Sequence, residues 1–285
     1  MFRPTSSFDL SGRARTIAAA GLALAAFLAV AAWSSSARAS GCTNTFTNTA
    51  GGSWGTAGNW SKKSVPTASE EACITEPGTY TVEMAQGTVT VKTLTVGASS
   101  GAQTLAVEST SSQNADLITS EGLAIGAHGA VSMTNDPGDG DTNNVTISSS
   151  VNDAGTLSSE AGKGGSRTIA GSLTNTGTLA VNANTEYNGE AATLTNEGSL
   201  TLAEGKTLKV SGKSAAVNGA GGKIAATGTG EVLVTGSTAS FTEGAGSTSG
   251  ALPVVLDDSS LSYTGSGAST IALRGTSALG GNLAA

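Results

Sequence analysis

The residues best suited to chemistry in this 285-residue chain are carboxylates and amides grouped in one polar segment. Asp139, Asp141 and Asn143 place side-chain oxygens at alternating positions, and oxygens are the ligands that calcium-binding loops use. Such a loop ends on a glutamate at its twelfth position, where this chain has Ser150. We therefore expect a solvated, protruding loop, with calcium binding as the alternative. This loop is the first candidate for a site that binds a specific partner.

One adjacent carboxylate pair, Asp257 and Asp258, could supply the acid and base of glycosidic bond cleavage. The pair follows an apolar run, so we expect a turn after a buried strand. A serine or cysteine nucleophile would need His128, the only histidine of the chain, as its base. Because His128 stands between Gly126 and Gly129, we expect it in an exposed turn and assign no catalytic residue.

The two cysteines, Cys42 and Cys73, are expected to form a disulfide, which is the usual state of cysteines outside the cytoplasm. The bridge would close a loop of about thirty residues and contribute about 3 kcal/mol. Lipidation of Cys42 is the alternative. A zinc site has too few ligands, since the chain offers only these two cysteines and one distant histidine.

Residues 1–39 carry the features of an export signal. Three arginines precede an apolar run over residues 17–33, and Ala37 and Ala39 form an A-x-A cleavage signature. The run is at the lower limit of the roughly 17–25 residues that a membrane-spanning helix needs, which leaves an uncleaved anchor as the alternative. We predict cleavage after Ala39, secretion or display at the cell surface, and no membrane insertion of the mature chain.

The charge balance excludes some partners. The chain has a net charge of −7, from 14 basic and 21 acidic residues. Loss of four basic residues and one acidic residue with the signal leaves 10 basic residues against 20 acidic ones. Nucleic acids and anionic lipid surfaces attract clustered Lys and Arg, so neither is an expected partner.

An internal repeat is the most informative feature of the chain. Four segments share the pattern apolar-x-Asn/Asp-x-Gly-x-Leu, and they begin at Val151, Leu173, Leu194 and Val217. Their starts recur at a nearly constant spacing of about 22 residues, which is the signature of a repeat architecture. A looser copy begins at Leu117, and the loop of residues 135–144 accounts for its greater distance from Val151.

Short runs of alternating apolar and polar residues, such as residues 179–181 and 200–202, are typical of strands with one buried face. A repeat of about 21–23 residues with two or three such strands predicts an all-β fold, a parallel β-helix. Stacking of coils would bury the apolar face that no single coil can bury alone.

Two further positions recur with the repeat, one occupied by Asn or Asp and one by Gly. At the first, side chains could hydrogen-bond along the stack or adopt a left-handed turn, and its members are Asp153, Asn175 and Asn196. At the second we expect glycines at sharp corners with positive φ, namely Gly155, Gly177, Gly198 and Gly221.

The opening of the mature chain carries a motif: Gly52-Ser-Trp54, Asn59-Trp60, Pro66, Glu71-Ala-Cys73-Ile74 and Tyr80-Thr-Val82. It resembles the start of bacterial secreted β-helix proteins, both autotransporter-like passengers and pectin-lyase-like helices. The resemblance implies a right-handed parallel β-helix and a secreted or surface location. It does not imply one activity, because this fold hosts lyases, hydrolases and adhesins. The hydrolase motifs Asn-Thr-Asp, Gly-His-Gly and Arg-x-Lys do not accompany the carboxylate pair.

Trp54 and Trp60 are expected to belong to an N-terminal cap, because the first coil of a solenoid exposes apolar side chains and open strand edges. A platform on which sugars stack is the alternative.

These observations predict a signal peptide (1–39), an N-terminal cap segment (40–79) and a β-helix repeat domain (80–285). We expect a secreted or cell-surface scaffold with a structural or adhesive role, without catalysis or a bound cofactor. Surface polysaccharide or another protein is the expected partner. The alternative is a polyuronate lyase or hydrolase with an incomplete site. Open strand edges after the last coil indicate a truncated chain or a partner that covers that end.

Overall fold

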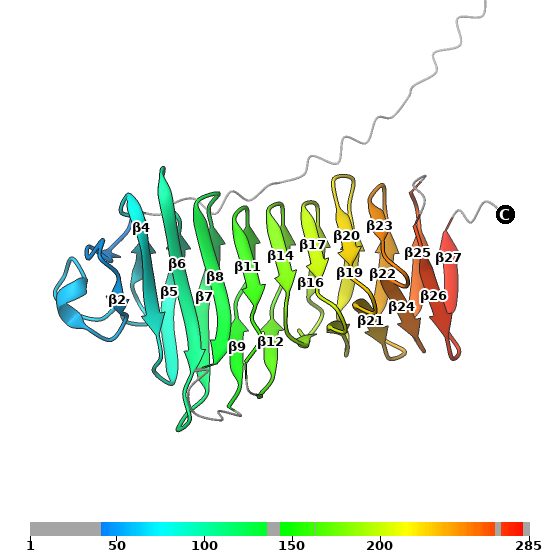
Figure 1. The fold of residues 1–285 in the computed structure, drawn as a ribbon, viewed down its shortest axis with the longest axis horizontal. Coiled ribbons are helices and arrows are strands. Elements are labelled where there is room, and N and C mark those ends of the chain that lie inside the picture. Colours follow the sequence, from blue (N-terminus) through cyan, green and yellow to red (C-terminus); the bar gives the residue numbers. More distant parts are fainter. Residues whose placement is uncertain (1–40, 136–142, 163, 266–268, 282–285) are drawn as a thin grey trace, which may run out of the picture. The chain divides into compact units, whose positions relative to one another are not determined.

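The structure is a computed structural model that describes residues 41–281 apart from 136–142, 163 and 266–268. Within these residues the chain is all-β, as predicted, and parallel strands stack coil upon coil into a β-solenoid (Figure 1). The helical content of this described part is one 3-10 turn at Ala57–Asn59, and none of its helices is long and apolar enough to cross a membrane. The proposed signal segment, with Ala37 and Ala39, lies outside the described residues.

Most coils contribute one strand segment to each of three faces, and the strands pair in parallel with those of neighbouring coils. Face 1 consists of the first halves of β5 (Thr88–Val96) and β7 (Ala115–Ile125), then β9 (Val145–Ser148), β12 (Arg167–Ala170), β15 (Thr185–Tyr187), β18 (Thr207–Val210), β21 (Glu231–Thr235), β24 (Val254–Asp257) and β26 (Ile271–Arg274). Face 2 consists of β1 (Asn44–Thr45), β3 (Glu71–Ile74), the second halves of β5 and β7, β10 (Val151–Asp153), β13 (Leu173–Asn175), β16 (Thr193–Asn196), β19 (Ala215–Asn218), β22 (Ser240–Glu243), β25 (Ser260–Tyr263) and β27 (Ala278–Gly281). Face 3 consists of β2 (Gly52–Ser53), β4 (Gly78–Met84), β6 (Gly101–Ser109), β8 (Gly129–Asn135), β11 (Thr156–Ser159), β14 (Thr178–Val181), β17 (Ser199–Leu202), β20 (Lys223–Ala226) and β23 (Ser247–Ser249).

The strand register confirms the central repeat and corrects both of its ends. Val151 pairs with Leu173 and Leu173 with Leu194, so these coils have the lengths that the sequence spacing predicts. Leu194 pairs with Ala216 and not with Val217, because Ala216 points into the core while Val217 points outward. Before the repeat, Val151 pairs with Leu123 rather than Leu117.

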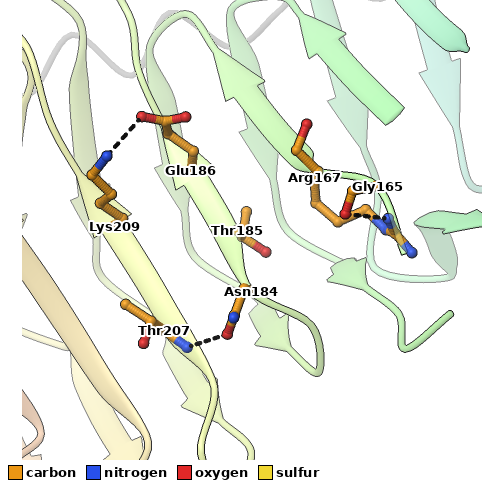
Figure 2. A pocket seen from close by; sticks show the side chains of 8 residues that line it. Gly165, Arg167, Asn184, Thr185, Glu186, Thr207 and Lys209 are labelled. Carbon is orange, nitrogen blue, oxygen red and sulfur yellow. Dashed lines mark hydrogen bonds and ion pairs between the residues drawn. The ribbon is translucent and has the colours of Figure 1, made fainter. Parts of the chain in front are cut away.

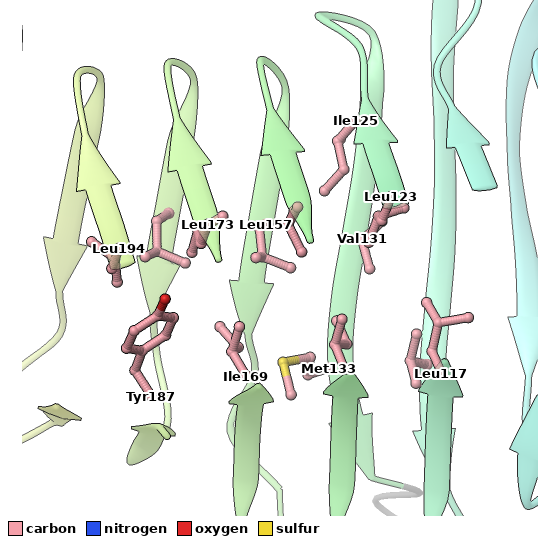
Figure 3. Close-up of a cluster of buried hydrophobic side chains, with 14 of the residues drawn as sticks. Leu117, Leu123, Ile125, Val131, Met133, Leu157, Ile169, Leu173, Tyr187 and Leu194 are labelled. Carbon is pink, nitrogen blue, oxygen red and sulfur yellow. The ribbon is translucent and has the colours of Figure 1, made fainter. Parts of the chain in front are cut away.

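Columns of aliphatic side chains fill the interior, with members from consecutive coils (Figure 3). Leu123, Val151, Leu173 and Leu194 form one column on face 2, and none of them is more than 3% exposed. Alternation places them inside because successive side chains of a strand point to opposite faces. Burial of each such side chain contributes about 1.5–3 kcal/mol, so coil stacking provides the core.

The repeated glycines have a different role from the predicted one. Gly155, Gly177 and Gly198 do not have positive φ. A Cβ at Gly177 would lie 2.3 Å from the backbone oxygen of Gly155, and one at Gly198 would lie 2.4 Å from that of Gly177. Glycine is needed because the backbones of adjacent coils approach closely. In the last copy Gly222, rather than Gly221, precedes the face-3 strand in the same register, since Lys223 pairs with Ser199.

A buried polar ladder runs beside the glycines along face 2. We call this series the amide ladder, and its register partners are Asp153, Asn175, Asn196, Asn218 and Glu243. Asn175 Nδ2 donates to Asn196 Oδ1 (2.8 Å), and Asn196 Nδ2 donates to Asn218 Oδ1 (3.0 Å). Asn218 Nδ2 donates to Glu243 Oε1 (3.0 Å). All five side chains are buried. The predicted hydrogen bonding along the stack is confirmed for Asn175 and Asn196, whereas Asp153 bonds to backbone N–H groups of its own coil.

The N-terminal segment packs on the first long coil. The predicted disulfide between Cys42 and Cys73 is present. The Trp54 and Trp60 rings lie 4.7 Å apart between centroids, and Trp60 Nε1 donates to the Trp54 backbone oxygen (2.8 Å). Both indoles are completely buried, as is Phe46 against Trp60, so neither tryptophan presents a face on which a sugar could stack.

Candidate functional site

A groove with a volume of about 330 Å³ opens on face 1, where β12, β15 and β18 begin (Figure 2). This volume lies at the lower end of the range of small-ligand sites. The groove is lined by Gly165, Ser166, Arg167, Asn184, Thr185, Glu186, Thr207 and Lys209. These residues come from three consecutive coils, so the groove exists only in the stacked solenoid.

The groove lies where a series of strand caps is interrupted. Before three of the face-1 strands, β7, β9 and β15, an asparagine caps the next coil. Asn114 Oδ1 accepts the backbone N–H of Asn144 (2.9 Å), and Asn144 Oδ1 accepts that of Ser166 (2.9 Å). Asn184 Oδ1 accepts the N–H of Thr207 (3.1 Å). Ser166 occupies the same position, but its side chain is shorter than that of asparagine. The space beside Ser166 therefore opens toward Asn184.

An acid–base pair lies at the edge of the groove. Glu186 Oε1 accepts hydrogen bonds from Lys209 Nζ (3.4 Å) and from Ser211 Oγ (3.0 Å). The Glu186 and Lys209 side chains are 36% and 47% exposed, and an ion pair of such exposure contributes little to stability. Their polar groups can therefore exchange this contact for a ligand at small cost. Together with Asn184 and Thr207 they offer amide, hydroxyl, carboxylate and ammonium groups.

Arg167 forms one wall of the groove, although the residue is only 2% exposed. Its guanidinium turns away from Lys209 and Glu186 (Figure 2) and donates to the backbone oxygens of Gly164 (3.0 Å) and Glu160 (3.1 Å) and to Asn135 Oδ1. Arg167 occupies an inward position between Val145 and Thr185, where the pattern predicts an apolar residue. The Arg167 side chain thereby links the segment before β12 with the end of β8, and these contacts fix the position of this wall of the groove.

Of the predicted calcium ligands, only Asn143 lies within the described residues. Its Nδ2 donates to the Thr110 backbone oxygen (2.7 Å), and its own backbone oxygen accepts from Ser109 Oγ and from Asn135 Nδ2, each at 3.2 Å. Asp139 and Asp141 lie outside the described residues. The described part of the chain contains no cluster of acidic, histidine or cysteine side chains that could hold a metal ion. Calcium binding stays a prediction.

The other candidate groups lie apart from the groove. Asp257 ends β24 and Asp258 is in the turn that follows, as predicted, with a φ of 51°. The backbone N–H of Thr276 donates to Asp258 Oδ1 (2.7 Å) and lowers the pKa of this carboxyl group, so it stays ionised near neutrality. His128 is exposed in the turn before β8, also as predicted.

Sequence reasoning missed the groove. The available signal was weak. An asparagine (Asn114, Asn144 or Asn184) directly precedes β7, β9 and β15, whereas Ser166 holds this position before β12. Comparison with protein-family models, with curated proteins and with solved structures finds no match to this chain.

Proposed function

We propose that this protein is an exported β-solenoid scaffold with a structural or adhesive role, which binds surface polysaccharide in the face-1 groove. The observation that carries the proposal is the groove itself, where three consecutive coils bring Asn184, Thr207, Glu186 and Lys209 together. Sugar hydroxyls are both donors and acceptors, and this set of side chains offers both functions. The groove lies on a repetitive surface, along which a long polymer could make further contacts.

Two features support export. Residues 1–39 have the basic, apolar and A-x-A order of a signal peptide. The bridge between Cys42 and Cys73 is of a kind that persists in oxidising compartments and is rare in the cytosol. Fusion of residues 1–39 to a reporter that is active only outside the cytoplasm tests this part. Sequencing the mature N-terminus should give Ser40 as its first residue.

Binding is tested on the purified protein with a glycan array, followed by calorimetry with the oligosaccharide that gives the strongest signal. We expect Lys209→Ala and Glu186→Ala each to weaken binding about tenfold, because a hydrogen bond to a charged group contributes about 1.5–3 kcal/mol. The solenoid offers a matched control pair outside the groove, Lys213 and Glu190, whose charged atoms lie 3.5 Å apart. Their alanine variants should bind as the unaltered protein does.

Equal affinities of groove and control variants would show that saccharides bind elsewhere. Absence of glycan binding, together with saturable binding to a protein-coated surface, would instead identify a protein as the partner. Either result would overturn the proposed polysaccharide site without affecting the evidence for export.

A further inference from the structure

The amide ladder has a direction. Asn175, Asn196 and Asn218 each donate Nδ2 to the side chain one coil further along the chain. Asn196 and Asn218 each accept with Oδ1 from the coil before. At one end, the Glu243 carboxylate is a suitable acceptor. At the other end, Asn175 Oδ1 is buried and has no hydrogen-bond partner among the described residues. A buried amide oxygen without a partner is costly, so a donor is needed there.

The residue that the register places beside Asn175 is Asp153. Asp153 is 1% exposed, and its two carboxyl oxygens accept the backbone N–H groups of Gly155 (2.9 Å) and Leu157 (3.2 Å). An ionised aspartate can only accept hydrogen bonds, so it would set acceptor against acceptor at this step. A neutral carboxyl group has the O–H that the ladder lacks.

The surroundings favour the neutral form. Burial raises the pKa of Asp153 to about 6, and the two backbone N–H donors offset only part of this effect. Strands β8, β11, β13 and β14 carry no charged residue, and on β7 Asp116 and Glu121 both point outward. His128, in the turn before β8, is exposed. No cation on these elements therefore holds Asp153 ionised.

We infer that Asp153 is a proton-binding residue of the solenoid: it takes up a proton from solvent and donates it in a hydrogen bond to Asn175 Oδ1, which closes the amide ladder. Loss of the proton breaks the first step of the ladder, between β10 and β13. Acidification thus strengthens the contact between these two coils, and alkaline conditions weaken it.

The pH range follows from the pKa of Asp153. This pKa is raised in the folded state from 3.8 to about 6. The contribution of Asp153 to stability is therefore fully present below about pH 3.8 and is lost as the pH rises through about 6. Burial also raises the pKa of Glu243, although the Asn218 amide opposes this, so Glu243 acts in the same direction. An experiment must separate the two groups.

The first experiment is ¹³C NMR of aspartate carboxyl carbons in the full protein, with the Asp153 signal identified by its loss in Asp153→Asn. We expect its titration midpoint near pH 6, against about 3.9 for an ordinary aspartate. The second experiment measures thermal unfolding at pH 4.5 and pH 8. Asp153→Asn gives this coil the Asn-x-Gly pattern that Asn175 and Gly177 have in the next coil, and so provides a permanent donor.

We expect Asp153→Asn to raise the melting temperature at pH 8 and to reduce the difference between pH 4.5 and pH 8. Glu243→Gln removes only the contribution of Glu243, and Asp257→Asn controls for loss of one negative charge outside the ladder. An Asp153 midpoint at or below about 3.9 would overturn the inference. So would an Asp153→Asn variant that melts lower at pH 8 and keeps the full pH dependence, since Asp153 would then act as an ionised acceptor.

Discussion

Asn196, in the middle of the amide ladder, provides the sharpest test of how the coils are held together. Its side chain accepts from Asn175 Nδ2 (2.8 Å) and donates to Asn218 Oδ1 (3.0 Å) and to the Lys223 backbone oxygen (3.3 Å). In Asn196→Ala, Asn175 Nδ2 keeps its bond to the Ser199 oxygen (3.0 Å), whereas Asn218 Oδ1 loses the Asn196 donor.

The expected loss of stability follows from these contacts. The Asn218 oxygen left buried without a donor costs about 1–3 kcal/mol, and the two other lost hydrogen bonds, from Asn175 and to the Lys223 backbone oxygen, cost about 0.5–1 kcal/mol each. We therefore expect Asn196→Ala to lower the free energy of unfolding by roughly 3 kcal/mol, measured by urea denaturation followed by circular dichroism. Thr195→Ala is the matched control on the outward side of the same strand, and it should change stability by about 0.5 kcal/mol or less. Equal stabilities of the two variants would refute the structural role of the ladder.

Three further predictions concern other contacts between coils. Gly198→Ala should cost about 1–3 kcal/mol by overpacking against the coil before, whereas Gly58→Ala, with open space around its added Cβ, should be nearly neutral in the same urea assay. Reduction of the Cys42–Cys73 disulfide should destabilise the N-terminal coil by about 3–4 kcal/mol, measured as faster hydrogen exchange and proteolysis there. Trp60→Ala should cost about 3–5 kcal/mol, measured by urea denaturation, because it leaves a cavity in a completely buried aromatic cluster.

Each of these predictions has a result that contradicts it. A Gly198→Ala variant as stable as Gly58→Ala would mean that the coils can move apart without cost. Unchanged hydrogen-exchange rates after reduction would mean that side-chain packing alone holds the N-terminal coil and that the disulfide adds no stability. A Trp60→Ala variant with unaltered stability would show that the aromatic cluster does not close the first coil.

Most of the fold could be predicted because its signals are local. Alternation along strands and a regular sequence period identify the solenoid, and Asn175 and Asn196 lie in the part of the chain where coil length is nearly constant. The pairing of Cys42 with Cys73 needed no structure, since the chain has no other cysteine. The repeat pattern placed the wrong residue inward at Val217. Ala216 and Val217 are both apolar, so the sequence does not tell which of them faces the core, and in the structure it is Ala216.

The candidate site was much less predictable. The groove depends on Ser166, Asn184 and Thr207, which are common surface residue types that lie on three different coils. The buried position of Arg167 was equally hidden, because its guanidinium is satisfied by backbone oxygens that no sequence pattern marks.

The sequence by itself determined the all-β solenoid, the disulfide and the recurrence of asparagine and glycine, because each depends on residue type and spacing within one coil. Only the tertiary structure decided which side chains meet between coils. Coil lengths vary with their loops, and the coil from Leu173 to Leu194 is shorter than the one from Ala216 to Phe241. That register sets the glycines against backbone oxygens, places Asp153 beside Asn175, and brings three coils together around the groove.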